Sequence, residues 1–249
     1  MHAGEIADST RHAGEYGVKA EFIAMDMVAV NAYKDGVVAR LHKGLQGLVK
    51  SRNVTFIEGH GKLVAANTVE VNGEKYIGKN IILATGSYPK TLPGLEIDGT
   101  VIITSEQAIN LDRVPKSVIV LGGGVIGCEF ASVWKSFGAE VTIIEGLPHL
   151  VALEDESSSK QLERAFRKRG INFELGIKFK SATKSKTGVE VTLEDGKTFT
   201  AEVLLVAVGR GPVSANIGYE EQGIKMERGY VIVDDKCRTN VPGVWAVGD

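Results

Sequence analysis

The stretch KSVIVLGGGVIGCEFASVWKSFGAEVTIIE, residues 116–145, decides the fold. An apolar run at 117–121 leads into the glycine-rich segment GGGVIG, residues 122–127. A segment of helical character follows, and a second apolar run, 141–144, ends at Glu145. A dinucleotide-binding βαβ unit has a strand before such glycines and a helix after them. The stretch therefore predicts a parallel sheet with a dinucleotide site at its first crossover.

Each glycine of this pattern has a physical task. Gly122 permits the tight turn, Gly124 lets the backbone approach a pyrophosphate, and Gly127 lets helix and strand pack closely. The amides at the start of the helix would face the phosphates, where the helix dipole favours negative charge. The alternative is a purely structural turn. The predicted pyrophosphate site comprises Gly122, Gly123, Gly124, Val125, Ile126 and Gly127.

Glu145 selects the nucleotide. It lies 18 residues after Gly127, where an acidic side chain meets the adenosine ribose. Its carboxylate can accept hydrogen bonds from the ribose hydroxyls and would repel a 2′-phosphate. Residues 146–150 contain no Arg or Lys that could hold such a phosphate. We therefore expect NAD rather than NADP; the alternative is that Glu145 is a solvated acid at a strand end.

The composition is that of an ordinary globular protein. The chain has 249 residues, 43% of them hydrophobic and 24% charged, which suits one large or two medium domains. A net charge of −2 gives no reason to expect nucleic acid or an anionic membrane as a partner. No apolar run approaches the ~20 residues that span a bilayer. Residues 1–8 lack the features of a secretory signal, so a cytoplasmic location is expected.

The cysteines give no sign of a metal or a disulfide. Cys128 and Cys237 are the only two, and neither belongs to a Cys-x-x-Cys pair or to a set with metal-ligand spacing. We therefore expect no bound metal and a reducing environment. Both side chains are expected to be small buried hydrophobes.

Hydrophobic periodicity predicts helices and antiparallel strands around the central unit. Before the stretch it predicts helices at 3–13 and 35–51, strands at 54–57, 62–65, 68–71, 74–77, 80–83 and 101–103, and a short helix from Ser105. After it, the periodicity predicts a helix at 155–169 and strands from 173 and at 189–193, 198–201, 203–208 and 230–233. Asn72-Gly73 and Asp195-Gly196 are hairpin turn signals.

Two parts of the chain resemble each other at the scale of a domain. Residues 80–87 and 203–210 are both apolar strands that end in glycine, and each follows an antiparallel hairpin. This favours two related dinucleotide domains.

Four motifs together resemble the flavoprotein disulfide reductases, the class I pyridine nucleotide-disulfide oxidoreductases. They are Ala84-Thr85-Gly86-Ser87, the segment 122–129, Val208-Gly209-Arg210 and the ending 239–249. The resemblance covers essentially the whole chain. It implies an α/β fold: a Rossmann-like FAD/NAD(P)-binding three-layer architecture with antiparallel β-meanders. An NAD-binding domain would be inserted into a partial FAD-binding domain.

The resemblance also implies domain boundaries and roles. Residues 1–113 would be the partial FAD-binding domain, 114–238 the NAD-binding domain, and 239–249 the return strand of the FAD-binding domain. The implied NAD contacts, beyond the pyrophosphate site, are Glu129, Glu145, Phe179 and Gly209. The implied FAD contacts are Gly61, Thr85, Gly86, Ser87 and Asp249.

Three of these roles have structural alternatives. Glu129 would approach the nicotinamide and the flavin as a catalytic residue, or it is an acid near a helix start that the dipole favours. Phe179 would line the adenine side, or it is a core residue. Gly61 would touch the FAD adenosine, or it is a turn glycine.

Parts of the family pattern are not found in these 249 residues. They are the amino-terminal glycine motif for the ADP half of FAD, the redox pair Cys-x-x-x-x-Cys, and the dimerisation domain with its His-Glu base. We therefore expect an internal piece of a longer enzyme, with an incomplete FAD site.

Within the family, the chain is most similar to the members that oxidise dihydrolipoamide with NAD. For the parent enzyme, the resemblance implies a homodimer that serves 2-oxo acid dehydrogenase complexes. This chain by itself is expected to be inactive and limited to NAD binding. The alternatives are another NAD-linked member, of the mercuric reductase, NADH oxidase or transhydrogenase type, and a non-catalytic NAD-binding module.

Overall fold

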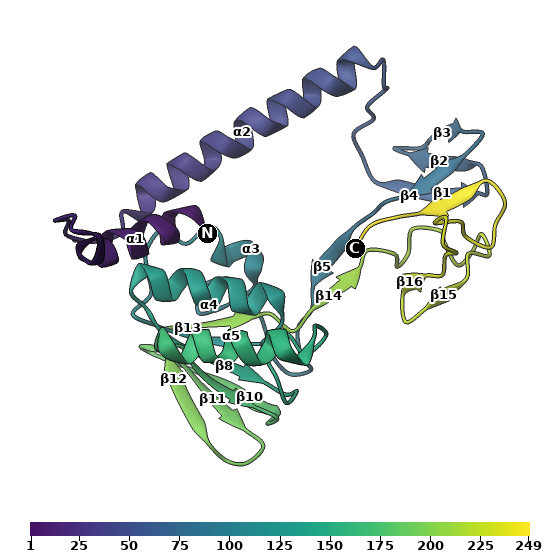
Figure 1. The fold of residues 1–249 in the computed structure, drawn as a ribbon. Helices are drawn as coiled ribbons and strands as arrows, with labels where there is room; N and C mark the ends of the chain where they lie inside the picture. Colours follow the sequence, from purple (N-terminus) through teal and green to yellow (C-terminus); the bar gives the residue numbers. More distant parts are fainter. The chain divides into compact units, whose positions relative to one another are not determined.

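A computed structural model describes residues 1–249 and divides the chain into two compact units. The first unit contains Met1–Ala39 and Pro89–Gly209. The second contains Arg40–Tyr88 and Arg210–Asp249. Helix α2, Met27–Ser51, has residues in both (Figure 1).

The first unit is built on a parallel sheet. Its other helices are α1 (His2–His12), the 3-10 helix η1 (Ala13–Tyr16), α3 (Ser105–Ala108), α4 (Val125–Phe137) and α5 (Glu156–Lys168). Its strands are β6 (Ile102–Ile103), β7 (Ser117–Leu121), β8 (Glu140–Glu145), β9 (Asn172–Leu175), β10 (Phe179–Ser185), β11 (Gly188–Leu193), β12 (Thr198–Ala201) and β13 (Val203–Val206). Five of them form a parallel sheet in the order β6-β13-β7-β8-β9, and β10-β11-β12 form an antiparallel sheet.

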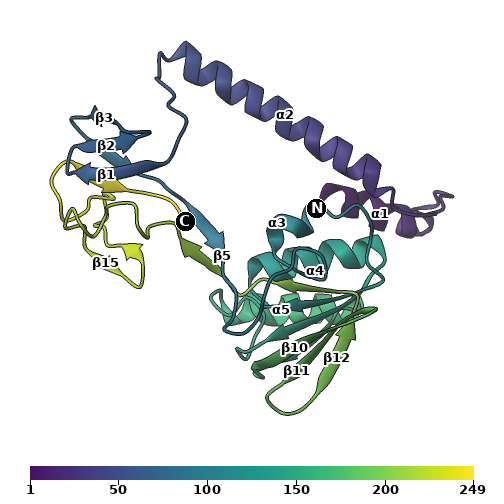
Figure 2. The ribbon, with the colours of Figure 1, turned by 180° about the vertical axis from the view of Figure 1, so that it is seen from behind.

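The parallel sheet is buried on both faces, which explains why its strands are continuously apolar. Val118 and Val120 of β7 pack in one cluster with residues of α4 and α5. Ile119 and Leu121 point the other way, into a cluster with β11. Figures 1 and 2 show α4 and α5 over one face of the sheet and the antiparallel sheet over the other. The predicted three-layer α/β fold is confirmed.

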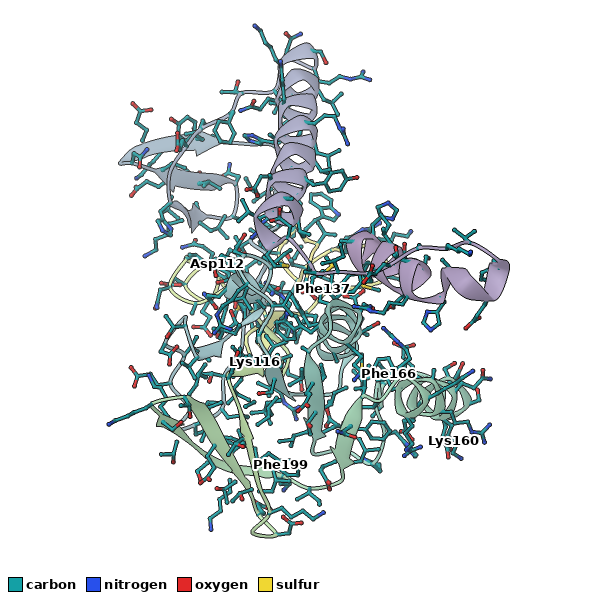
Figure 3. All side chains as sticks on the ribbon, turned by 90° about the vertical axis from the view of Figure 1, so that its left-hand side faces the viewer. Asp112, Lys116, Phe137, Lys160, Phe166 and Phe199 are labelled. Atoms are coloured by element: carbon teal, nitrogen blue, oxygen red, sulfur yellow. The ribbon has the colours of Figure 1, made fainter.

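Side chains of the outer layers follow the same division. Phe166 of α5 is buried against the helical face of the sheet, whereas Lys160 on the same helix is exposed (Figure 3). Phe199 of β12 packs on the opposite face. The spacing of six residues between Lys160 and Phe166 places them on different sides of a helix with 3.6 residues per turn.

A polar cluster attaches α1 to α4. The Ser136 hydroxyl donates to Asp8 Oδ2 at 2.6 Å and accepts from Arg169 at 2.8 Å. Arg169 also lies 3.3 Å from Asp8. Gly4 permits the close approach, because a Cβ atom there would lie 3.1 Å from Ser136 Cβ.

The second unit is mainly antiparallel. Its strands are β1 (Gly61–Ala65), β2 (Thr68–Val71), β3 (Glu74–Ile77), β4 (Ile81–Leu83), β5 (Ser87–Pro89), β14 (Arg210–Pro212), β15 (Met226–Glu227), β16 (Tyr230–Val231) and β17 (Val244–Ala246). The predicted meander β1-β2-β3 is confirmed, and its second turn is at Asn72-Gly73. The ending pairs in parallel with β4, with Trp245 opposite Ile82. Leu63, Leu83 and Val244 belong to its core.

Several segments differ from the sequence-based expectation, among them the short strands β5, β14 and β15, which the periodicity does not predict. The strand predicted at 54–57 is wrong: this segment pairs with no other strand, and Phe56 is 78% exposed. Helix α2 begins eight residues before the predicted Asp35, since Asp26 accepts a hydrogen bond from the Ala29 amide and caps it. Strand β10 was not predicted, because its sequence FKSATKS has no apolar run.

The two cysteines differ in their exposure to solvent. Cys128 is buried, as expected, but the expectation that Cys237 is buried is wrong. Cys237 lies in an exposed turn with a φ of 59°, and its amide donates to Asp234 O. A turn at the surface keeps its side chain in solvent.

Asp98 connects the edge of the parallel sheet with the antiparallel sheet. Its Oδ1 accepts hydrogen bonds from the amides of Thr100, Val101 and Ile102 at 2.6, 2.8 and 3.1 Å. Its Oδ2 forms an ion pair with Lys184 Nζ of β10 at 2.7 Å. Burial opposes ionisation of Asp98, but Lys184 and the loop donors together hold its pKa well below the usual range.

We expect Asp98→Ala to lower the free energy of unfolding by about 2–3 kcal/mol at pH 7, because three backbone donors lose a charged acceptor. The contribution should be complete above the ordinary carboxyl pKa and should fade as the pH drops below about 4, since the folded-state pKa is depressed. Urea unfolding at several pH values measures both effects. Asp112→Ala, at an exposed aspartate, is the matched control. Equal effects of the two substitutions would contradict the prediction.

Candidate functional site

The turn between β7 and α4 is built on backbone contacts that only glycine allows. Gly122 has a φ of 110°, and a Cβ atom there would lie 2.3 Å from Ala207 O. A Cβ atom at Gly127 would lie 1.9 Å from Gly122 O. Any side chain at either position would push α4 away from β7 and β13, so these two glycines set how closely the helix begins beside the strand.

The start of α4 presents unpaired amides to solvent. Gly124 and Val125 are exposed, and Ile126 is half-buried. Gly124 is the N-cap, and no side chain caps the helix. A Cβ atom at Gly124 would meet nothing within 4 Å, so the space in front of the turn is open. Free amides at the positive end of a helix dipole form an anion-binding surface.

Glu145 is brought to this turn by the register of the sheet. In that register Leu121 lies opposite Ile144, which puts the carboxyl ends of β7 and β8 side by side. Glu145 Oε2 accepts a hydrogen bond from the Gly123 amide at 2.6 Å. Its Oε1 accepts from the Leu147 amide at 2.8 Å. The acid and the glycine turn therefore form one site, at the edge of the sheet where α/β proteins bind ligands.

Cys128 lies beneath the turn. Its Sγ donates to Gly123 O across 3.3 Å. Burial, with a smaller contribution from the charge of Glu145, raises the pKa of the Cys128 thiol to about 12. The thiol is therefore neutral at physiological pH and is not an activated nucleophile.

The other predicted NAD contacts lie in the same unit. Glu129 is exposed in the second turn of α4. Gly209 is exposed just after β13, has a φ of 106°, and its carbonyl accepts from the Lys90 amide at 2.9 Å. Phe179, the first residue of β10, is half-buried and packs against the cluster around β11, as a core residue would. Its place beside an adenine stays a prediction.

Sequence reasoning missed Lys178. A Cβ atom at Gly146 would lie 3.8 Å from Lys178 Cγ, so this lysine adjoins the residue that follows Glu145. It makes no ion pair in the structure. Residues 146–150 contain no Lys or Arg, whereas Lys178 comes from the segment after β9 and is adjacent to Gly146 only in the folded chain.

The predicted FAD contacts lie in the second unit, and three of its motifs meet there. The Ser87 hydroxyl donates to Asp249 Oδ2 at 2.9 Å and accepts from Arg210 Nε at 2.6 Å. Arg210 Nε is also 3.3 Å from Asp249 Oδ2. Gly86 O accepts from the Val213 amide, and the Thr85 hydroxyl donates to Val213 O.

A cavity of about 130 Å³ adjoins these residues. Thr85, Gly86, Tyr219 and Asp249 are among its lining residues. Burial raises the pKa of Tyr219, although its contact with the Thr85 hydroxyl lowers it slightly. Gly61 opens strand β1 opposite Val71, so it is a strand residue and not the turn glycine considered as an alternative.

Two further findings concern metal ligands and membrane-spanning helices. No group of three or more His, Cys, Asp or Glu side chains is arranged to hold a metal ion. None of the helices combines the length and the apolar character needed to cross a membrane.

Known proteins resemble this chain over nearly its whole length. The model of the family described as pyridine nucleotide-disulphide oxidoreductase matches residues 3–249. A curated dihydrolipoyl dehydrogenase from Cupriavidus necator is 37% identical over 98% of this chain and 54% of its own length. The chain spans about half the length of the curated relatives it matches.

Two solved structures have the same fold. LpdA from Mycobacterium tuberculosis is 28% identical, with a TM-score of 0.90 over 100% of this chain and 56% of its own. The HOCl-induced flavoprotein disulfide reductase RclA from Escherichia coli is also 28% identical, with a TM-score of 0.81 over 98% of this chain and 55% of its own.

The match to the family model covers the glycine turn, Glu145 and the motifs around Ser87. The chain therefore belongs to the pyridine nucleotide-disulphide oxidoreductase family, whose members are flavoproteins that use FAD and NAD(P).

Proposed function

We propose that residues 114–209, the part of the predicted NAD-binding domain (114–238) that lies in the first unit, bind NAD and that the chain contributes this step to a dihydrolipoyl dehydrogenase. The observation that carries the proposal is the combination of free amides at the start of α4 with the Glu145 carboxylate at the same turn. Gly124, Val125 and Ile126 would donate to the pyrophosphate. The open space at Gly124 leaves room for it.

Glu145 would hold the adenosine ribose. Each carboxylate oxygen accepts one backbone hydrogen bond and has a further lone pair for a ribose hydroxyl. A 2′-phosphate would place negative charge beside this acid, which favours NAD over NADP. Lys178 acts in the opposite direction, since its charge would attract such a phosphate. We propose that Glu145 prevails, because its carboxylate is fixed by two hydrogen bonds and Lys178 is held by none.

Glu129, Gly209 and Phe179 complete the proposed NAD contacts. Glu129 lies one turn into α4, where its exposed carboxylate could orient a nicotinamide amide. The exposed backbone at Gly209 could lie against the nucleotide at the end of its strand. Phe179 is partly buried in the core, and the exposed part of its ring would lie beside the adenine.

Gly61, Thr85, Gly86, Ser87 and Asp249 are the residues proposed for FAD. Their fit rests on the cavity beside Thr85 and Gly86 and on Asp249, whose carboxylate is 77% exposed and free to accept a ribitol hydroxyl. When bound, FAD supplies the two-electron relay between a dithiol–disulfide pair and NAD.

Dihydrolipoamide is proposed as the substrate from the similarity to the Cupriavidus necator enzyme. The balanced reaction oxidises the dithiol to the cyclic disulfide, reduces NAD⁺ to NADH and releases one proton. The proposal includes a cytoplasmic location, a homodimer and service to 2-oxo acid dehydrogenase complexes. A mercuric reductase, NADH oxidase or transhydrogenase would use the same NAD residues.

A second candidate is NAD binding without turnover by this chain. The cysteines favour it: Cys128 is a buried neutral thiol, and Cys237 lies in a separate surface turn. Neither provides the reactive pair that dithiol oxidation requires.

The glycine turn can be tested by adding single methyl groups. Gly124→Ala should leave the melting temperature unchanged but weaken NAD binding about tenfold or more, because its methyl group enters the open space before the amides. Gly127→Ala should lower the free energy of unfolding by about 2 kcal/mol or more, because its Cβ meets Gly122 O. Calorimetric titration and thermal unfolding measure the two effects. Gly44→Ala, on exposed α2, is the control; unchanged NAD affinity in Gly124→Ala would refute the site.

Nucleotide choice can be tested at Glu145. Glu145→Gln should weaken NAD binding about tenfold and bring NADP binding close to that of NAD, because repulsion of the 2′-phosphate is lost while Lys178 remains. Adding Lys178→Gln should remove the gain for NADP. Glu140→Gln, at the opposite end of β8, is the matched control. Equal binding of NAD and NADP by the unaltered chain would contradict the assignment.

Turnover separates the two candidate functions. We expect this chain to bind NAD but to show no NAD reduction with dihydrolipoamide, because it has no reactive cysteine pair. Absorbance at 340 nm with added FAD measures the reaction. Turnover above a control without protein, or a yellow protein with one FAD per chain, would reject the non-catalytic candidate.

A further inference from the structure

A buried carboxylate that is not among the proposed nucleotide contacts binds the loop that follows Glu145. Glu163 of α5 is only 6% exposed. A carboxylate at such a position must be hydrogen-bonded to offset the loss of water. Both of its closest donors lie in residues 146–151, the loop that follows Glu145.

Glu163 Oε1 holds this loop at two adjacent residues. It accepts from the Leu150 amide at 3.3 Å and lies 3.2 Å from His149 Nδ1, where a carboxylate makes the imidazole the donor. Arg167 approaches its other oxygen at 3.8 Å. The Glu163 carboxylate therefore attaches two adjacent residues of the loop to α5.

The same loop supports the glycine turn from below. Leu150 is fully buried, and its Cδ2 would lie 2.7 Å from a Cβ atom at Gly123. The Val151 amide donates to Gly123 O at 2.8 Å. Gly123 is also the residue whose amide donates to Glu145. Movement of Leu150 or Val151 would therefore move the turn that faces the pyrophosphate.

The loop is held in a strained conformation. Val151 has a φ of 45°, in the left-handed region that a β-branched residue adopts only under constraint. Its carbonyl accepts from the Ser159 hydroxyl of α5 at 3.3 Å. Strain of this kind costs on the order of 1–3 kcal/mol and persists only where neighbouring contacts impose it.

We propose that Glu163 is a positioning residue for dinucleotide binding. It fixes His149 and Leu150 and keeps Val151 in its strained conformation. Gly123 is then held so that its carbonyl meets the Val151 amide and its own amide meets Glu145. Without the Glu163 carboxylate, Val151 relaxes, Leu150 shifts and the turn loses its binding geometry. The inference rests on the proposed NAD site.

The experiment compares two substitutions of Glu163 by calorimetric titration with NAD. Glu163→Ala should weaken NAD binding about tenfold, because the loop is released. Glu163→Gln should weaken it by no more than about threefold, since the amide oxygen still accepts from Leu150. Glu140→Gln is the control, at an exposed glutamate on β8. Circular dichroism checks that each variant is folded.

A second substitution separates positioning from a general loss of stability. Val151→Gly in the Glu163→Ala background should restore NAD affinity to within about threefold of the unaltered chain, because glycine adopts a positive φ without strain. A loss of affinity caused only by a weakened core would not recover, since Val151→Gly removes further packing.

The outcomes are distinguishable. Unchanged NAD affinity in Glu163→Ala, or a loss that Val151→Gly does not restore, would overturn the positioning role and leave the proposed function intact. Failure of the unaltered chain to bind NAD would overturn both.

Discussion

The contact between Gly127 and the carbonyl of Gly122 is the constraint on which the rest of the first unit depends. A single added carbon at Gly127 would lie 1.9 Å from that oxygen. This closeness lets α4 begin directly behind the end of β7, with its first amides facing outward and unpaired. Amides in that position are costly if buried without a partner and valuable if an anion supplies one. The same geometry therefore explains a fold feature and a binding site.

The turn does not stand alone, because neighbouring segments fix it through Gly123. The amide of Gly123 donates to Glu145 at the end of β8, and its carbonyl accepts from Val151 in the following loop. Leu150 fills the space beneath it. Glu145, the glycine turn and the loop therefore share one backbone residue, Gly123. A change in any of them is transmitted to the others over single hydrogen bonds, which is why a buried acid on α5 can matter to the site.

In the second unit, side chains and not backbone amides form the group of interest. Ser87, Arg210 and Asp249 come from three distant parts of the sequence and meet in one hydrogen-bonded group. Arg210 neutralises Asp249 while leaving most of that carboxylate exposed. A charge that is both paired and accessible can accept a ligand hydroxyl without the cost of full burial. The FAD contact proposed for Asp249 rests on this exposure of a paired carboxylate.

Local sequence patterns are enough to predict the three-layer α/β fold, the glycine turn and the family, because each depends on apolar strands, on glycines at fixed spacing or on short motifs. They fail where local pattern and tertiary environment disagree. Residues 54–57 have a strand pattern but pair with no strand, and β10 has a polar pattern but joins a sheet. Only the tertiary structure placed Lys178 beside Gly146 and Glu163 against the loop. Hydrophobic periodicity shows which face of a helix or strand is buried, but it does not show which polar side chain of a distant segment lies against it.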